Sequence, residues 1–129
     1  MSTLIIYSGG SNTTAVAEYI AGKTSGKAVK VASAGSEDLS SYDSIVFGTR
    51  VHAGRIPKDL TEFVEANKSA LSGKNTAFYL CCMYNDEKGQ KQVQGIAEGL
   101  GFSKYAFFNK AKKIIQEDNN EVDAFISKL

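Results

Sequence analysis

Residues 4–14 read Leu4-Ile5-Ile6-Tyr7-Ser8-Gly9-Gly10-Ser11-Asn12-Thr13-Thr14. The apolar start of this stretch predicts a strand, and a helical pattern begins near Ala15. Between them lies a loop of glycines and hydroxyl residues. Glycines allow backbone N–H groups to turn inward, and the start of a helix adds unpaired donors and the positive end of its dipole. The order strand, loop, helix therefore predicts a phosphate site.

The chemistry of this loop narrows the kind of phosphate. It lacks the Gly-Lys-Ser/Thr ending of a nucleoside triphosphate loop, and residues 7–14 contain no lysine or arginine. A loop that offers hydroxyls and amides without a cation favours flavin mononucleotide (FMN) over ATP or GTP. The alternative is that Asn12 or Thr13 is an ordinary helix N-cap, which is the commonest role of such residues.

Working outward, the chain alternates between strand and helix patterns. Strands are predicted at residues 4–7, 28–32, 44–47, 76–82 and 105–108, and several are continuous apolar runs, as in a parallel sheet covered on both faces. Helical spacing appears in four of the intervening or following segments, with Pro57 near the start of one and Gly101 at the end of another. Residues 36–42 leave room for about one helical turn. We expect one α/β domain over residues 1–129, a three-layer α/β/α sandwich around a five-stranded parallel sheet.

In this architecture ligands bind at the carboxyl ends of the strands, which selects residues 8–14, 49–57 and 82–89. The second of these loops carries Arg50, His52 and Arg55. Val51 and His52 are suited to cover a flat ring, and the cations would offset negative charge on a reduced flavin or an anionic substrate. The alternative is a solvated basic turn.

The third loop offers Tyr84 for stacking and Asn85 for hydrogen bonds to a polar ring edge. Alternatively, Tyr84 anchors the loop by partial burial. The adjacent Cys81 and Cys82 are unsuited to a mutual disulfide and are expected to be free thiols. With one histidine in the chain, no zinc site of the usual spacing is expected.

Composition and missing motifs exclude several functions. A formal net charge of +1 gives no reason to expect nucleic-acid binding. No apolar stretch approaches the ~20 residues of a membrane span, so we expect a cytoplasmic protein. Residues 8–9 and 48–49 lack the acidic groups of a phosphorylated receiver domain, and the Gly-x-Gly-x-x-Gly dinucleotide motif is absent. The Cys-x5-Arg motif of a cysteine phosphatase is also missing, and no catalytic acid, base or nucleophile is predicted.

These segments resemble the flavodoxin family. The similarity rests on Leu4-Ile5-Ile6-Tyr7-Ser8, on Asn12-Thr13 followed by Val16-Ala17-Glu18, and on Tyr42-Asp43-Ser44-Ile45-Val46-Phe47-Gly48. Residues 48–64, with Gly54 and Asp59-Leu60-Thr61-Glu62-Phe63-Val64, are especially similar to the branch that includes bacterial protoporphyrinogen dehydrogenase.

The resemblance implies a flavodoxin-like sheet of order 2-1-3-4-5 that binds FMN. In the family the first loop holds the phosphate and the other two flank the isoalloxazine ring. Carried over to this sequence, the cofactor-binding residues are Ser8, Gly9, Gly10, Ser11, Asn12, Thr13, Thr49, Arg50, Val51, His52, Ala53, Gly54, Cys82, Met83, Tyr84 and Asn85.

Three departures from the family matter. The first loop is one residue shorter than usual, the second loop is basic where electron-carrier flavodoxins tend to be acidic, and residues 101–113 leave no room for the extra segment of the protoporphyrinogen-oxidising members. We expect an FMN-binding electron carrier between a reductase and an acceptor protein, rather than a stand-alone enzyme. The alternatives are a flavodoxin-fold binding or regulatory module without FMN, and a protoporphyrinogen-oxidising enzyme.

Overall fold

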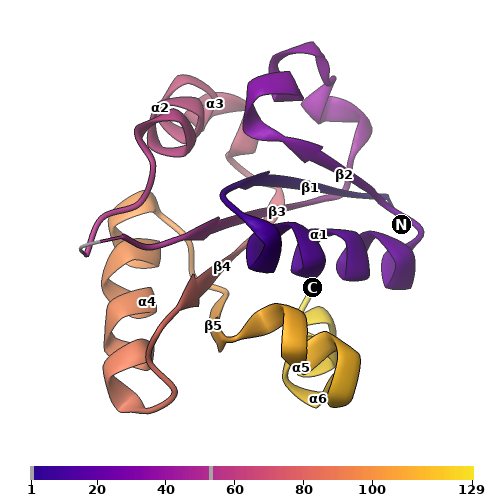
Figure 1. Ribbon diagram of the computed structural model, residues 1–129. Coiled ribbons are helices and arrows are strands. Elements are labelled where there is room, and N and C mark those ends of the chain that lie inside the picture. Colours follow the sequence, from indigo (N-terminus) through magenta and orange to yellow (C-terminus); the bar gives the residue numbers. More distant parts are fainter. Residues whose placement is uncertain (1, 53) are drawn as a thin grey trace.

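The computed structural model describes residues 2–52 and 54–129 and alternates strands with helices along the chain (Figure 1). Two of the connections are short 3-10 helices, labelled η. The elements in chain order are β1 (Thr3–Ser8), α1 (Ser11–Thr24), β2 (Lys27–Lys30), η1 (Val31–Ser36), η2 (Leu39–Ser41), β3 (Ser44–Arg50), α2 (Lys58–Ala66), α3 (Lys68–Leu71), β4 (Asn75–Cys82), α4 (Glu87–Leu100), β5 (Tyr105–Asn109), α5 (Ala111–Glu117) and α6 (Asn120–Ile126).

The five strands form one parallel sheet in the order β2-β1-β3-β4-β5, which confirms the predicted fold. The register aligns the carboxyl ends of the central strands: Ser8 pairs with Thr49, and Arg50 pairs with Cys81. At the edge of the sheet, Cys82 pairs with Asn109. The residues that follow these strands therefore meet at one edge of the sheet.

Apolar side chains cover both faces of the sheet, so the strands are nearly continuous hydrophobic runs. On one face α1, α5 and α6 pack through a cluster that includes Ile20, Val122 and Phe125, and on the other α2, α4 and the η turns pack through Leu60 and Val93 (Figure 1). Helix α4 begins where the Asp86 side chain accepts a hydrogen bond from the Lys88 N–H. It ends at Gly101, whose φ of 92° is the left-handed conformation of a C-cap.

Three sequence expectations are corrected. Strand β2 ends at Lys30, because residues 31–36 coil into η1 instead of extending the strand to residue 32. Helix α1 begins at Ser11 rather than near Ala15, since the two glycines complete the turn before it. A helix at residues 111–117 was not expected, because its lysine-rich sequence shows little apolar periodicity.

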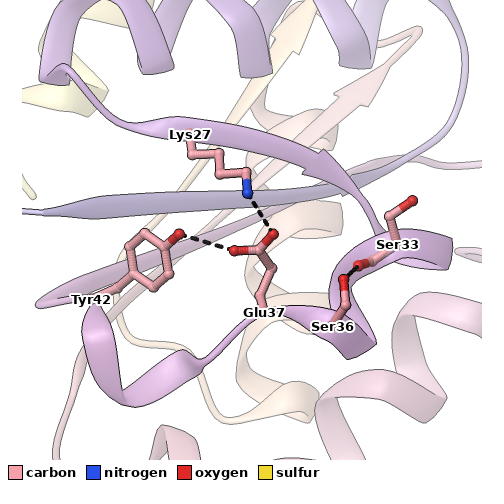
Figure 2. A network of polar contacts seen from close by, with 5 residues as sticks. All are labelled: Lys27, Ser33, Ser36, Glu37 and Tyr42. Atoms are coloured by element: carbon pink, nitrogen blue, oxygen red, sulfur yellow. Dashed lines mark hydrogen bonds and ion pairs between the residues drawn. The ribbon is translucent and has the colours of Figure 1, made fainter.

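A polar network stabilises the helix-poor connection between β2 and β3 (Figure 2). The Glu37 carboxylate accepts a 2.7 Å bond from Lys27 Nζ and a 3.0 Å bond from the Tyr42 hydroxyl. The Ser36 hydroxyl donates to the Ser33 carbonyl and closes the turn of η1. The hydrogen bond from Lys27 lowers the pKa of Glu37, and the same contact raises the pKa of Lys27. This network therefore holds the chain where a longer crossover helix is absent.

Within the described residues, no helix combines the length and apolar character needed to cross a bilayer.

Candidate functional site

The turn from β1 into α1 consists of Gly9 and Gly10 alone. Gly9 has a φ of 143°, a conformation that residues with side chains rarely adopt. Gly10 is the N-cap of α1 and provides no side-chain hydrogen bond to the helix. The alternative that Asn12 or Thr13 caps the helix is therefore wrong, because both residues lie within its first turn. The first N–H groups of α1 have no capping side chain, which is the arrangement that suits an anion.

Thr13 is fully buried, and its hydroxyl has no nitrogen or oxygen partner among the described residues; the group beside it is the Cys81 thiol, which is only a weak hydrogen-bonding group. A Cβ atom at Gly9 would lie 2.8 Å from this hydroxyl and 3.2 Å from Cγ of Arg50. A side chain at residue 9 would collide with the Thr13 hydroxyl. The turn can lie this close to the hydroxyl because Gly9 has no side chain. Burying a hydroxyl without a strong hydrogen-bond partner costs free energy, which a ligand that hydrogen-bonds to it would offset.

A cavity of about 390 Å³ opens at this turn, within the usual range for small-ligand sites. It is formed where the ends of four strands converge on the start of α1. Its lining consists of Gly10, Ser11, Asn12, Thr13, Arg50, Val51, Cys81, Cys82, Met83, Phe108 and Lys110. Eight of these eleven are predicted site residues, so residues from the three predicted loops do meet.

Two of the predicted phosphate-loop side chains have protein partners. The Ser8 hydroxyl donates to both oxygens of Asp59, at 3.0 and 3.2 Å, and so bonds to the start of α2. The Asn12 side chain accepts a 2.9 Å bond from the Lys112 N–H and fixes the start of α5 beside the start of α1. Ser11 and Thr13 also line the cavity, and neither hydroxyl has a nitrogen or oxygen partner among the described residues.

The second loop lies partly beside the cavity. Thr49 is buried below it and donates a 2.8 Å bond to the Ser8 carbonyl. His52 and Arg55 exchange two backbone hydrogen bonds, of 2.8 and 3.0 Å, and Gly54 between them has a φ of 77°. The predicted Ala53 lies outside the described residues. His52 and Gly54 do not line the cavity, but they follow Arg50 and Val51, which do.

The third loop presents two apolar side chains to solvent, and Met83 lines the cavity whereas the predicted Tyr84 does not. Met83 is 92% exposed and Tyr84 is 42% exposed, and these are the exposed large apolar side chains of the described chain. The predicted Asn85 does not line this cavity but lines another hollow. Met83 thus adds exposed apolar surface to one wall of the cavity.

The two cysteines are free thiols, as expected. Burial raises the pKa of the Cys81 thiol to about 12, while the nearby Thr13 hydroxyl opposes that rise. Burial also raises the pKa of Cys82. Both are therefore protonated near neutral pH, and neither has the thiolate character of a redox or nucleophilic cysteine. The described residues also hold no cluster of three or more His, Cys, Asp or Glu side chains that could bind a metal ion.

A larger hollow of about 1050 Å³ lies over the open edge of β5, bordered by α5 and α6. Of the predicted site residues it contains Asn85 alone. Its position along an edge strand, rather than across the carboxyl ends of the central strands, makes it the weaker candidate for a cofactor.

A family model described as a flavodoxin domain, Flavodoxin_5, matches residues 4–125. The chain belongs to this flavodoxin-domain family. The match establishes the family but does not confirm the narrower likeness to the protoporphyrinogen dehydrogenase branch. No curated protein matches the sequence.

Solved structures with the same fold cover this flavodoxin domain along almost its whole length. Oxidised Flavodoxin 2 from Bacillus cereus is 19% identical with a TM-score of 0.69, and each chain is covered over 100% of its length. A flavodoxin from the domain Archaea is 16% identical with a TM-score of 0.65, covering 99% of this chain and 98% of that one. A putative flavoprotein from Bacteroides eggerthii is 11% identical with a TM-score of 0.69, covering 99% and 96%. These likenesses show the fold.

Three residues of the cavity in this flavodoxin domain were not predicted from the sequence: Cys81, Phe108 and Lys110. Cys81 lies within the predicted strand 76–82 and before the third predicted loop, and the other two lie at the end of β5, which contributed none of the three predicted loops. The expected strand order 2-1-3-4-5 already places β5 beside β4, and the shared edge of their strand ends was the signal that could have pointed to Phe108 and Lys110.

Proposed function

We propose that this flavodoxin domain binds FMN non-covalently and passes electrons between a reductase and an acceptor protein. The observation that carries the proposal is the start of α1, where uncapped N–H groups and the Thr13 hydroxyl border one cavity. Such a site matches a phosphate group, which brings acceptor oxygens and negative charge. The chain's membership of the flavodoxin-domain family supports FMN as the compound that carries the phosphate.

The apolar part of the cavity lining supports a place for the rest of the cofactor. Val51 and Met83 line it, and the exposed Tyr84 follows Met83 in the chain; their apolar surface is suited to a flat aromatic ring. When bound, FMN supplies the electron transfer itself, and the protein binds and orients it. The exposed Met83 keeps one side of this site close to the surface, as transfer to a partner protein requires.

A fluorescence titration tests FMN binding. One equivalent of FMN per chain should be quenched, whereas riboflavin, which lacks the phosphate, should bind more weakly. Thr13→Val removes the hydroxyl at nearly constant volume, so it should weaken FMN binding by roughly tenfold, equivalent to one lost ligand hydrogen bond, without loss of stability. Thr14→Val is the matched control, because the Thr14 hydroxyl donates to the Gly10 carbonyl and does not line the cavity.

Protein that leaves FMN fluorescence unchanged would overturn the proposal and favour a binding module without flavin. Electron transfer is tested separately on the FMN-loaded protein. After reduction with dithionite and removal of the excess, it should reduce cytochrome c faster than an equal concentration of free reduced FMN exposed to the same buffer. No transfer from protein that holds FMN would restrict the proposal to flavin binding.

A further inference from the structure

We propose that the positive charges of Arg50 and Lys110 together bind the negatively charged phosphate of the ligand. The site thereby selects a phosphate monoester over the same compound without its phosphate. The inference rests on the proposed function and assigns a specificity-determining role to two cations of the same cavity. The first loop has no cation of its own, and the fold brings these two from the ends of β3 and β5.

The charge of the cavity lining is the first argument. Arg50 and Lys110 both line it, and the lining contains no aspartate or glutamate. Neither cation forms an ion pair or a side-chain hydrogen bond with any residue that the structure describes. Two positive charges thus border one cavity without compensation, in a chain whose formal net charge is only +1. A dianionic phosphate would balance both.

The placement of Arg50 is the second argument. Its Cγ would lie 3.2 Å from a Cβ at Gly9, so its stem lies against the turn that precedes α1. Gly9 therefore permits two close approaches at once, by the Arg50 stem and by the Thr13 hydroxyl. This brings the arginine beside the uncapped N–H groups of α1. A guanidinium presents paired N–H donors that match two phosphate oxygens, which an ammonium group cannot do.

The backbone at Lys110 is the third argument. Lys110 has φ and ψ of 51° and 51°, one of two described residues other than glycine with a positive φ. Glycine or asparagine would adopt this conformation more readily. This left-handed residue joins β5 to α5 and lies at the cavity wall. The Asn12–Lys112 hydrogen bond holds this start of α5 against the start of α1.

The test compares FMN with riboflavin, which differ by the phosphate. Dissociation constants are measured for the wild type, Arg50→Met, Lys110→Asn and Lys113→Gln. Arg50→Met keeps the apolar stem and removes the charge, and Lys110→Asn removes the charge while tolerating the left-handed backbone. Lys113→Gln is the matched control, since it removes a lysine from the same helix that does not line this cavity.

We expect Arg50→Met and Lys110→Asn each to weaken FMN binding by about tenfold, the usual effect of losing one charge-assisted hydrogen bond, and to leave riboflavin within about twofold. Arg50→Lys should recover part of the loss, and Lys113→Gln should change neither constant. Equal weakening of FMN and riboflavin, or no change in FMN, would overturn the inference. Thermal unfolding of each variant identifies any that fails to fold, and the remaining cation variant then decides.

Inorganic phosphate separates failure of the inference from failure of the proposed function. Its binding is followed by the amide resonances of residues 10–13 in a nitrogen-15-labelled sample. Suppose that the wild type binds neither flavin, that phosphate shifts these amides, and that Arg50→Met abolishes the shift. The phosphate site formed with Arg50 is then supported, and the FMN proposal is overturned. If neither phosphate nor flavin binds, both are overturned.

Discussion

The Tyr79 hydroxyl donates a 2.8 Å hydrogen bond to the carbonyl of Thr13, 66 residues away in the sequence. Tyr79 is fully buried at the centre of β4, and Thr13 is in the first turn of α1. The bond joins the middle of the sheet to the helix start that borders the candidate site. The position of the turn proposed to bind phosphate therefore depends on a side chain that does not line the cavity.

Removing this hydroxyl tests its contribution. Tyr79→Phe keeps the ring and loses one buried hydrogen bond, which should lower the free energy of unfolding by about 0.5–1.5 kcal/mol. Denaturant unfolding measures this, and FMN affinity should fall with it because the first turn of α1 loses an anchor. An unchanged unfolding midpoint would show that the bond adds nothing to stability.

Gly48 is needed because the Tyr79 ring lies against it. A Cβ at Gly48 would lie 1.9 Å from Cζ of Tyr79, far inside van der Waals contact. Gly48→Ala should therefore destabilise the fold by about 1–3 kcal/mol. The control is Gly95→Ala in α4, where a Cβ would meet nothing within 4 Å and where alanine should stabilise the helix by about 0.5–1 kcal/mol. Both are read from denaturant unfolding, and equal effects would contradict the proposed contact.

The two neighbouring cysteines should differ in reactivity. Cys81 is 7% exposed with a pKa raised to about 12 by burial, whereas Cys82 is partly exposed and its pKa is raised by a lesser burial. Because the thiolate is the reactive form, iodoacetamide at pH 8 should modify Cys82 first and Cys81 only after denaturation. Peptide mass spectrometry assigns the modified residue. Faster labelling of Cys81 in the folded protein would contradict its burial.

The network around Glu37 should make stability depend on pH (Figure 2). The hydrogen bonds from Lys27 and Tyr42 lower the pKa of Glu37 below 4.5, so its contribution is complete above that pH and is lost as pH falls through the folded-state value. The raised pKa of Lys27 acts at the other end: its contribution is complete below pH 10.5 and is lost above it.

Denaturation midpoints measured from pH 3 to 7 test the acid side of this dependence. Glu37→Gln should be less stable than the wild type near pH 7, and the difference should shrink toward pH 3. Glu62→Gln is the control, because Glu62 forms no ion pair with a described residue. A constant difference between wild type and Glu37→Gln across this range would mean that the carboxylate charge is not what stabilises the network.

Much of the fold could be predicted because its strands are buried on both faces. Apolar runs such as residues 44–47 stand out against the polar loops, and the structure extends that strand through Arg50. Residues 31–32 were misassigned because Val31 and Ala32 continue the apolar run, although the chain there coils into η1. The sequence pattern predicts the start of α1 near Ala15 instead of at Ser11, because residues 11–14 are polar and show no helical periodicity.

The candidate site could be predicted only where residues follow a strand directly. Gly10 through Thr13 and Arg50 were found in this way. Lys110 also follows a strand, β5, but it was not predicted, because the three expected ligand loops follow other strands and no sequence pattern signals its left-handed backbone. The hydrogen bond from Ser8 to Asp59 could not be predicted either, because the two residues are 51 positions apart in the sequence.

The central claim is that the start of α1 holds the phosphate of FMN, and amide chemical shifts measure this most directly. One equivalent of FMN added to nitrogen-15-labelled protein should saturate the shifts, with the largest at Ser11, Asn12 and Thr13, whose N–H groups lie in the first turn. Riboflavin should leave these three amides far less changed. FMN that binds while these amides stay in place, or FMN that does not bind at all, would contradict the account.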